Sequence, residues 1–443
     1  MVIQFWNGAD GINVALWISI IIVVVIGLNI FAVSVYGEAE FIFASIKILT
    51  IVGLIIFAFI IDLGGGPTKD RLGFRYWSNP GAMKPYVADG DWGRFLGFFS
   101  TLVNAAFSYG GVEMVAVAAG EAENPRKNIP KAVRRVFWRI LFFYVLGSLA
   151  IGVLIPYNEP RLISAIGSKA AGGAASPWVI AIYRAGVPVL PSIINAVILT
   201  SATSSANAFL YTGSRYLYAL AQNGQAPKFL LHCSRKYVSQ PQLFFRCDHC
   251  PPHFLSIKMP MLTISFPNRG VPYYCILITA SVSLLTYMSC STGSSTVFTW
   301  FQNLTTIASL FTWMSVSIAY IQFHRALHAQ GISRNTLVFK SPWQPYTAYF
   351  SLTFFFLITL LNGFYTFPSP TKAFELDNFI TAYVGIPIFA ALFLIWKVVK
   401  GTRWVRPHEA DIQTGKAALD AADAHWPERR PRNVLERVWF WIA

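Results

Sequence analysis

The stretch Phe107-Ser108-Tyr109-Gly110-Gly111-Val112-Glu113 lies inside an apolar run that extends from residue 95 to residue 119. A helix that crosses hydrocarbon satisfies its backbone hydrogen bonds internally, and a charged side chain at its centre costs at least about 2.5 kcal/mol. A glycine pair and a carboxylate therefore fit such a helix only where its backbone lines a cavity. The stretch predicts a broken membrane helix whose peptide groups face a solute, as in transporters.

The composition of the chain indicates a membrane protein. Hydrophobic residues make up 55% of its 443 positions and charged residues only 12%, whereas soluble domains carry about 25% charged residues. The formal net charge is +15, but nine of the basic residues lie between Lys397 and Arg437 and most of the others fall in alternate loops. This distribution follows the positive-inside pattern of membrane proteins. We therefore expect no nucleic-acid partner and place the C-terminal tail, residues 397–443, in the cytosol.

Nine mostly apolar runs are long enough to cross the bilayer. They predict an all-α integral membrane protein with nine membrane helices, built as one polytopic domain over residues 1–396. The loops at 36–40 and 120–139 are expected on the cytosolic side. The predicted spans lie near residues 14–35, 41–61, 95–119, 136–155, 188–221, 271–288, 298–321, 346–364 and 379–396.

Sequence motifs occur around these spans in a definite order. The most distinctive are Tyr36-Gly37-Glu38-Ala39-Glu40-Phe41, Gly120-Glu121-Ala122-Glu123-Asn124-Pro125-Arg126-Lys127, Asn195-Ala196-Val197-Ile198-Leu199-Thr200 and Leu217-Tyr218-Ala219-Leu220-Ala221. In this order and spacing they closely resemble the fungal amino acid permease family of the amino acid–polyamine–organocation superfamily. The resemblance covers nearly all of residues 1–400. It implies an inverted-repeat fold of five plus five helices and proton-coupled uptake of amino acids across the plasma membrane.

The chain departs from the family pattern in two places. The resemblance implies twelve spans, so the nine found here correspond to the fourth to the twelfth, and the chain is either N-terminally truncated or begins at a wrong Met. The family's first broken helix, which carries half of the binding site, has no counterpart, and we expect weak or no transport by this chain. The second departure is residues 238–268, which contain five prolines and no helical or strand period. We interpret this stretch as a disordered insert from a retained intron.

A zinc site is a competing interpretation of the insert. Its candidate ligands are Cys247, His249, Cys250 and His253. They are crowded into seven positions, and no second pair stands at the spacing of a zinc finger. We therefore predict no metal and no cofactor.

Glu113 is the strongest candidate for a functional residue. It could hold a substrate ammonium or take part in proton transfer, because an acid inside the membrane is a site hypothesis by default. The alternative is a structural carboxylate bonded to a neighbouring helix. Gly110 and Gly111 are expected to leave amides free for a substrate carboxylate. The residues before the break would shape the side-chain pocket, with ordinary packing as the alternative; they are Phe107, Ser108 and Tyr109.

Two further groups are candidates for the transport route. Lys47 lies seven residues after Glu40, about 10 Å deeper along a helix, where it could gain and lose a proton. The resembling position in some superfamily members is linked to proton coupling, although Lys47 could equally snorkel to the cytosolic interface. Thr200, Ser204 and Asn207 share one side of the span 188–221. They could line the permeation route opposite the second span, or they could serve close helix packing.

The sequence excludes a membrane enzyme and leaves two functions. All seven histidines lie outside the predicted spans, and Glu113 is the one carboxylate deep within a span, so an acid–base pair or a nucleophile triad has no residues to use. A transporter and an amino acid sensor with a permease fold both fit the membrane sequence. The tail of 47 residues shows no evident interaction module, which favours transport. The expected partners are an amino acid, protons and membrane lipids, the last contacted by the basic segment 124–135.

Overall fold

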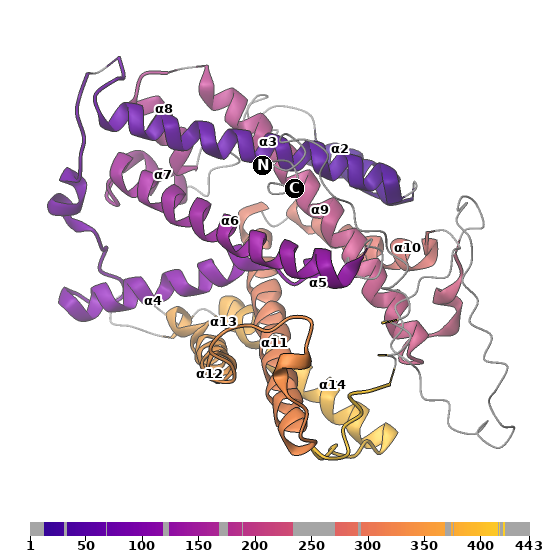
Figure 1. Ribbon diagram of the computed structural model, residues 1–443. Coiled ribbons are helices and arrows are strands. Elements are labelled where there is room, and N and C mark those ends of the chain that lie inside the picture. Colours follow the sequence, from indigo (N-terminus) through magenta and orange to yellow (C-terminus); the bar gives the residue numbers. More distant parts are fainter. Residues whose placement is uncertain are drawn as a thin grey trace, which may run out of the picture.

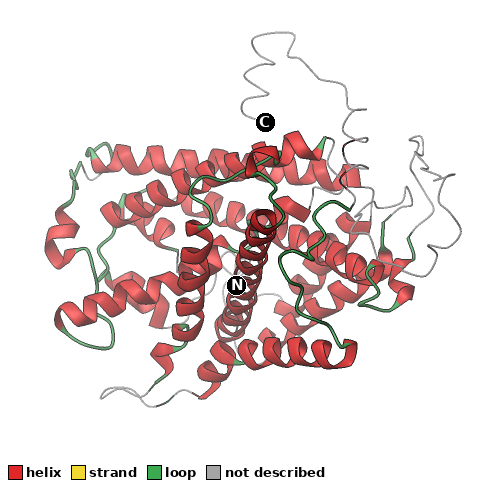
Figure 2. Cartoon of the chain, turned by 60° about the horizontal axis from the view of Figure 1, so that its bottom comes forward, coloured by secondary structure: helices red, strands yellow, loops and turns green. Residues whose placement is uncertain are grey.

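The computed structural model of the protein describes most of the chain. Within the described residues every regular element is a helix (Figure 2), and eight helices are long and apolar enough to cross a membrane. The all-α fold is thus confirmed, and the chain is an integral membrane protein. The described residues are 13–30, 33–67, 69–117, 124–167, 176–187, 189–233, 271–290, 294–367, 374, 376–414, 416 and 420.

The eight long helical segments correspond to the second to the ninth predicted spans. They are Gly37–Asp62, Gly90–Val117, Pro125–Leu154, Leu190–Gln222, Tyr273–Cys290, Thr296–Ala329, Tyr346–Thr366 and Leu376–Lys400. The first predicted span contains a shorter apolar helix, α2 (Val14–Ile30), of 17 residues. The count of nine membrane helices therefore stays a prediction.

One group of helices is organised around α9 (Leu190–Gln222). This helix packs against α2, α3 (Val33–Asp62), α8 (Pro177–Arg184) and α10 (Tyr273–Ser281), as Figure 1 shows. Twelve of its 33 residues are buried, several of them polar. Since apolar surface of a membrane helix can face lipid, buried polar residues mark the side of α9 that is turned to protein. We call this group the α9 bundle.

A second group is organised around α11 (Ser294–Ala329). Around it lie α4 (Gly90–Tyr109), α12 (Tyr346–Leu361), α13 (Leu376–Tyr383) and α14 (Gly385–Lys400), which gather in the lower part of Figure 1. We call this group the α11 bundle.

The broken helix joins the two bundles. Its first part, α4, packs against α11, whereas its second part, α5 (Met114–Val117), packs against α6 (Pro125–Leu154) and α9. The chain therefore passes from one bundle to the other between α4 and α5 (Figure 1). A rearrangement of the bundles relative to each other would act on this break.

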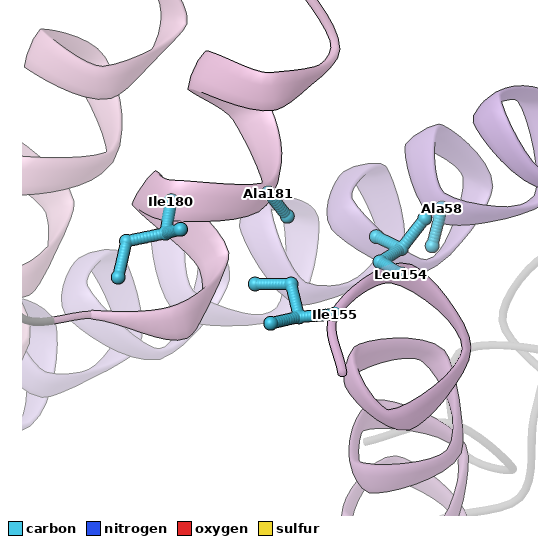
Figure 3. Packing of buried hydrophobic residues seen from close by; sticks show 5 residues of the cluster. All are labelled: Ala58, Leu154, Ile155, Ile180 and Ala181. Carbon is cyan, nitrogen blue, oxygen red and sulfur yellow. The ribbon is translucent and has the colours of Figure 1, made fainter. Parts of the chain in front are cut away.

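An apolar cluster fixes the connection between α6 and α9. Figure 3 shows Ala58 of α3, Leu154 and Ile155 at the end of α6, and Ile180 and Ala181 of α8 packed together. Each is at most 6% exposed, so the five side chains are covered by protein on nearly all sides. The short helices α7 (Pro160–Gly167) and α8 are thereby held on the helix ends.

Two helices begin before the predicted spans, because local helix signals extend them. Helix α3 begins at Val33, so residues 36–40 are helical rather than a loop, as befits their alternation of glutamate and alanine. Helix α6 begins at Pro125, because proline is favoured in the first turn, and the basic segment 124–135 forms its first turns. The predicted span 14–35 contains helix α2, which is described as far as Ile30.

The last predicted span, 379–396, consists of two helices. Helix α13 ends at Tyr383 and α14 begins at Gly385. A Cβ atom at Gly385 would lie 2.4 Å from Cγ2 of Ile307, so the helices can meet α11 here only through a glycine. Pro387 falls in the first turn of α14, where its missing N–H needs no partner.

Shorter turns and part of the tail complete the described structure. Gln330, directly after α11, donates through Nε2 to the carbonyl oxygens of Pro407 and Ala410 at 3.2 and 2.7 Å, which holds the beginning of the tail against the end of that helix. The predicted insert 238–268 and the tail after residue 420 lie outside the described residues. The turns of 3-10 or π helix are Trp77–Gly81, Lys228–Leu231, Val282–Cys290, Arg334–Thr336 and Phe364–Thr366.

Candidate functional site

The predicted break in the third span is present at the glycine pair. Helix α4 ends at Tyr109, and the backbone then leaves helical geometry at Gly110, with φ −55° and ψ 137°. Gly111 has φ +92°, a left-handed conformation that side chains disfavour, and helical structure resumes at Met114. The prediction of a broken helix is therefore confirmed.

Some of the peptide groups at the break are bonded within the protein. The Gly110 N–H donates to the Phe107 carbonyl at 3.1 Å, and the Met114 N–H donates to the Gly111 carbonyl at 3.1 Å. The Tyr144 hydroxyl of α6 donates to the Ser108 carbonyl at 2.8 Å. The prediction that Gly110 leaves a free amide is wrong, because a tight turn closes across the break and takes up that N–H.

Glu113 lies between the two bundles. Trp313 Nε1 of α11 donates to its Oε2 at 3.2 Å, and Tyr216 of α9 is near enough to interact with its charge. The side chain is half-buried. A carboxylate offers about four acceptor positions, so it can bind a cation while Trp313 fixes its orientation. The hydrogen bond from Trp313 is compatible both with a structural role of Glu113 and with a substrate-binding role.

Side chains from the neighbouring helices close around the glycine pair. A Cβ atom at Gly110 would lie 3.5 Å from Oγ of Ser309, and one at Gly111 would lie 3.9 Å from Cζ of Phe209. Ser309 belongs to α11 and Phe209 to α9. The break therefore lies against α6, α9 and α11.

The three residues before the break make contacts of their own. Phe107 packs edge-on against Phe298 at 6.2 Å, and Tyr109 packs edge-on against Tyr144 at 5.1 Å between ring centroids. Ser108 Oγ donates to the Asn104 carbonyl at 3.1 Å within the same helix. Their role in shaping a side-chain pocket stays a prediction.

A second polar site joins α3 and α9. Lys47 Nζ donates to Ser204 Oγ at 2.8 Å, and Ser204 Oγ donates to Glu40 Oε2 at 2.8 Å. One hydroxyl thus bridges the ammonium and the carboxylate. Ser204 has no exposed surface, which is consistent with its predicted position opposite the second span.

Two asparagines extend this site to α2. Asn207 Nδ2 donates to Glu40 Oε1 at 2.8 Å, and Asn29 Nδ2 donates to Asn207 Oδ1 at 2.7 Å. Both asparagines are buried, at 0% and 3% exposed. We call the five residues Asn29, Glu40, Lys47, Ser204 and Asn207 the polar cluster.

Sequence reasoning found part of this cluster and missed the rest. It placed Lys47, Ser204 and Asn207 on the transport route but assigned Glu40 to a loop. The spacing of seven residues between Glu40 and Lys47 was the available signal, because residues two turns apart share a face of a helix. Thr200 lies outside the cluster, since its hydroxyl donates to the Val197 carbonyl at 2.9 Å on its own helix.

Charged residues also meet in the connections next to α3 and α8. Arg184 donates to Glu159 Oε2 at 2.8 Å and to the Tyr76 hydroxyl at 2.6 Å. Arg75 pairs with Asp70 through both of its terminal nitrogens. The hydrogen bond from Arg75 lowers the pKa of Asp70 below its ordinary value of 3.8. In the part of the chain that the structure describes, no group of three or more His, Cys, Asp and Glu side chains could hold a metal ion.

Comparison with known proteins places this arrangement in a family context. A family model described as "Amino acid permease" matches residues 1–239 and 257–408. The gap between the two matched parts falls inside the stretch 238–268, whose interpretation as an insert stays a prediction.

Individual relatives match across the whole chain. The proline-specific permease of Emericella nidulans is 42% identical over 444 residues, which covers 100% of this chain and 74% of the relative. The dicarboxylic amino acid permease of Saccharomyces cerevisiae is 36% identical, with 100% and 68% covered. The lysine-specific permease of the same yeast is 37% identical, with 100% and 65% covered.

Proposed function

Because the chain belongs to the amino acid permease family, we propose that it carries amino acids across a membrane by alternating access, together with protons. The observation that carries this proposal is the helix break beside Glu113, at the junction of the two bundles. A broken helix places backbone dipoles and one acid where a zwitterion can bind.

The chemistry of the relatives' substrates agrees with such a site. The three relatives above are named for proline, for dicarboxylic amino acids and for lysine. These substrates differ in the charge of their side chains but share a positively charged amino group and a carboxylate. A site that binds the shared part needs an acid for the amino group, and Glu113 supplies it.

The end of α4 strengthens the same preference. The C-terminus of a helix carries a partial negative charge, which favours a cation near its last turn. Helix α4 ends at Tyr109, four residues before Glu113. The amino group of the substrate would therefore lie between the end of α4 and Glu113. The side chain of the substrate would then meet Phe107 and Tyr109.

Alternating access follows from the position of the break. Glu113 accepts a hydrogen bond from Trp313 of the α11 bundle, while α5 packs against α6 and α9. Movement of one bundle against the other would open the substrate position first to one side of the membrane and then to the other. Gly110 and Gly111 supply the backbone freedom for this movement.

Proton coupling would use the polar cluster. Lys47 is a membrane-embedded amine held by Ser204 Oγ at 2.8 Å, and such an amine can gain or lose a proton. The excess of basic residues in the tail favours a cytosolic C-terminus. With this orientation in the plasma membrane, uptake would follow the proton gradient into the cell.

The test is counterflow of labelled amino acids in proteoliposomes that contain the 443-residue chain. Saturable, pH-dependent exchange supports a transporter and contradicts the expectation that this chain transports weakly or not at all. The Glu113→Gln variant should lose exchange, and the matched Glu38→Gln variant should keep it, because Glu38 is exposed. Saturable binding without exchange would instead favour an amino acid sensor.

A further inference from the structure

We infer that Glu40 and Lys47 form one proton-exchange pair, in which the Ser204 hydroxyl passes the proton between them and Glu40 releases it. The inference rests on the proposed proton coupling. It assigns a role to Glu40, which the sequence alone placed in a loop.

The geometry of Ser204 fits a relay. Its Oγ accepts from Lys47 Nζ and donates to Glu40 Oε2, and both distances are 2.8 Å. A hydroxyl can accept and donate at the same time. Because Ser204 is fully buried, bulk water does not compete for these two bonds.

The step balances in protons and charge. The proton of the Lys47 ammonium bonds to Ser204 Oγ as its N–H bond breaks, while the Ser204 O–H proton bonds to Glu40 Oε2. The products are a neutral amine and a neutral carboxyl, and the hydroxyl is restored. Glu40 then releases its proton to water, and a new proton on the Lys47 amine restores the starting state.

Lys47 and Glu40 lie in different surroundings. Lys47 lies on the wall of a cavity of about 240 Å³, together with Ser201 of α9 and Ser176 and Trp178 at the start of α8. The lining is mainly apolar, and Lys47, Ser176 and Ser201 supply polar groups to which water can bond. Glu40 lies seven residues nearer to the N-terminus of α3, about 10 Å away along the axis, where Glu38 and Phe41 are exposed. The proton would therefore enter at Lys47 and leave at Glu40.

Two asparagines position the carboxylate. Asn207 Nδ2 donates to Glu40 Oε1 at 2.8 Å, and Asn29 in turn donates to Asn207. With Oε1 held in this way, Oε2 is directed to Ser204. Asn207 and Asn29 are therefore positioning residues of the pair.

The charged groups around the pair come from few elements. Helix α2 has no charged residue, and the one in α9, Arg215, has its guanidinium over the ring of Tyr211 at 3.7 Å. Helix α6 also packs against α3 and carries basic residues in its first half, among them Arg135 and Arg139. Glu40 is the group whose charge acts on Lys47.

The test measures proton movement without substrate. Proteoliposomes with the full chain are adsorbed on a solid-supported membrane and given a small pH step near neutrality. The unmodified chain should give a transient current, and Glu40→Gln and Ser204→Ala should reduce it or slow it by about tenfold or more. Glu38→Gln and Ser205→Ala, at exposed neighbouring positions, should match the unmodified chain.

A second measurement covers variants that fail to fold. Infrared difference spectra of the unmodified chain across the same pH step should show the C=O band of a protonated carboxyl, and Glu38→Gln should keep it. An unchanged transient in Glu40→Gln or Ser204→Ala, or no carboxyl band, would overturn the pair. Counterflow of labelled amino acids separates the two proposals. If labelled amino acids exchange but the transient currents of the variants match that of the unmodified chain, the proton-exchange pair is rejected and transport stands. If the transient current depends on Glu40 but no amino acid exchanges, transport is rejected and the pair stands.

Discussion

The helix break and the polar cluster face the same helix, α9, yet they are built in opposite ways. At the break, backbone groups and one acid are held by contacts from α6 and α11. In the polar cluster, five side chains from three helices bond one another in a continuous chain. Asn207 and Phe209 are two residues apart and point to nearly opposite sides of α9. One helix can thus support a deformable site on one face and a rigid one on the other.

If the polar cluster is the more rigid of the two sites, Asn207→Ala should have the largest effect on the thermal stability of the protein. This change removes the donor to Glu40 Oε1 and one acceptor of the Asn29 amide, which keeps its bond to the Val25 carbonyl. A buried group left unpaired costs about 1–3 kcal/mol. The apparent melting temperature in detergent should fall clearly, whereas Ser205→Ala should leave it unchanged. Equal melting temperatures for the two variants would show that the cluster does not stabilise the fold.

Among changes at the break, Glu113→Gln should have the largest effect on the affinity for an amino acid. Loss of a hydrogen bond to a charged group costs about 1.5–3 kcal/mol, so the dissociation constant of a labelled amino acid should rise about 10- to 150-fold. Equilibrium binding to purified protein measures this change. Unchanged affinity would assign Glu113 to a structural role.

The conformational requirement of the break can be tested separately with Gly111→Ala. At φ +92° a Cβ atom costs about 1–2 kcal/mol, and the turn should shift towards helix. Affinity should fall about 5- to 30-fold, while Gly37→Ala, at a helical position with no atom within 4 Å of its Cβ, should have no effect. An equal response from the two glycines would remove the special role of the break.

A smaller effect is expected from Trp313→Phe. The ring remains, but the N–H that donates to Glu113 at 3.2 Å is lost. A loss of about 1–1.5 kcal/mol corresponds to about a 5- to 12-fold weaker affinity for the amino acid. The affinity of the double variant with Glu113→Gln should equal that of Glu113→Gln alone if Trp313 acts through the carboxylate.

The smallest effect concerns Arg75→Gln, far from both sites. Because Arg75 lowers the pKa of Asp70 below 3.8, the pair stabilises the fold above that pH, and its contribution is lost as the pH falls through the lowered pKa. Below this pH range the variant and the unmodified chain should have the same melting temperature. Above it the variant should melt at a slightly lower temperature, and the difference should be small because exposed pairs contribute little. A difference that grows on acidification contradicts this assignment.

The break was predictable because its cause is local. Gly110, Gly111 and Glu113 are adjacent in the chain, and their chemistry is incompatible with an uninterrupted helix in lipid. The free Gly110 amide was predicted wrongly, since the turn that takes up its N–H depends on how the backbone closes. Trp313 and Tyr144 were also missed, because they reach the break from helices distant in the sequence.

By itself, the sequence determined the membrane environment, the helical class and the place where a helix must break. Each of these follows from hydropathy or from backbone conformation over a few neighbouring residues. Only the tertiary structure decided that Glu40 faces Ser204 and that α4 and α5 belong to different bundles. Such contacts depend on how separate helices rotate and pack against one another, and residues 164 positions apart in the chain carry no local signal of their meeting.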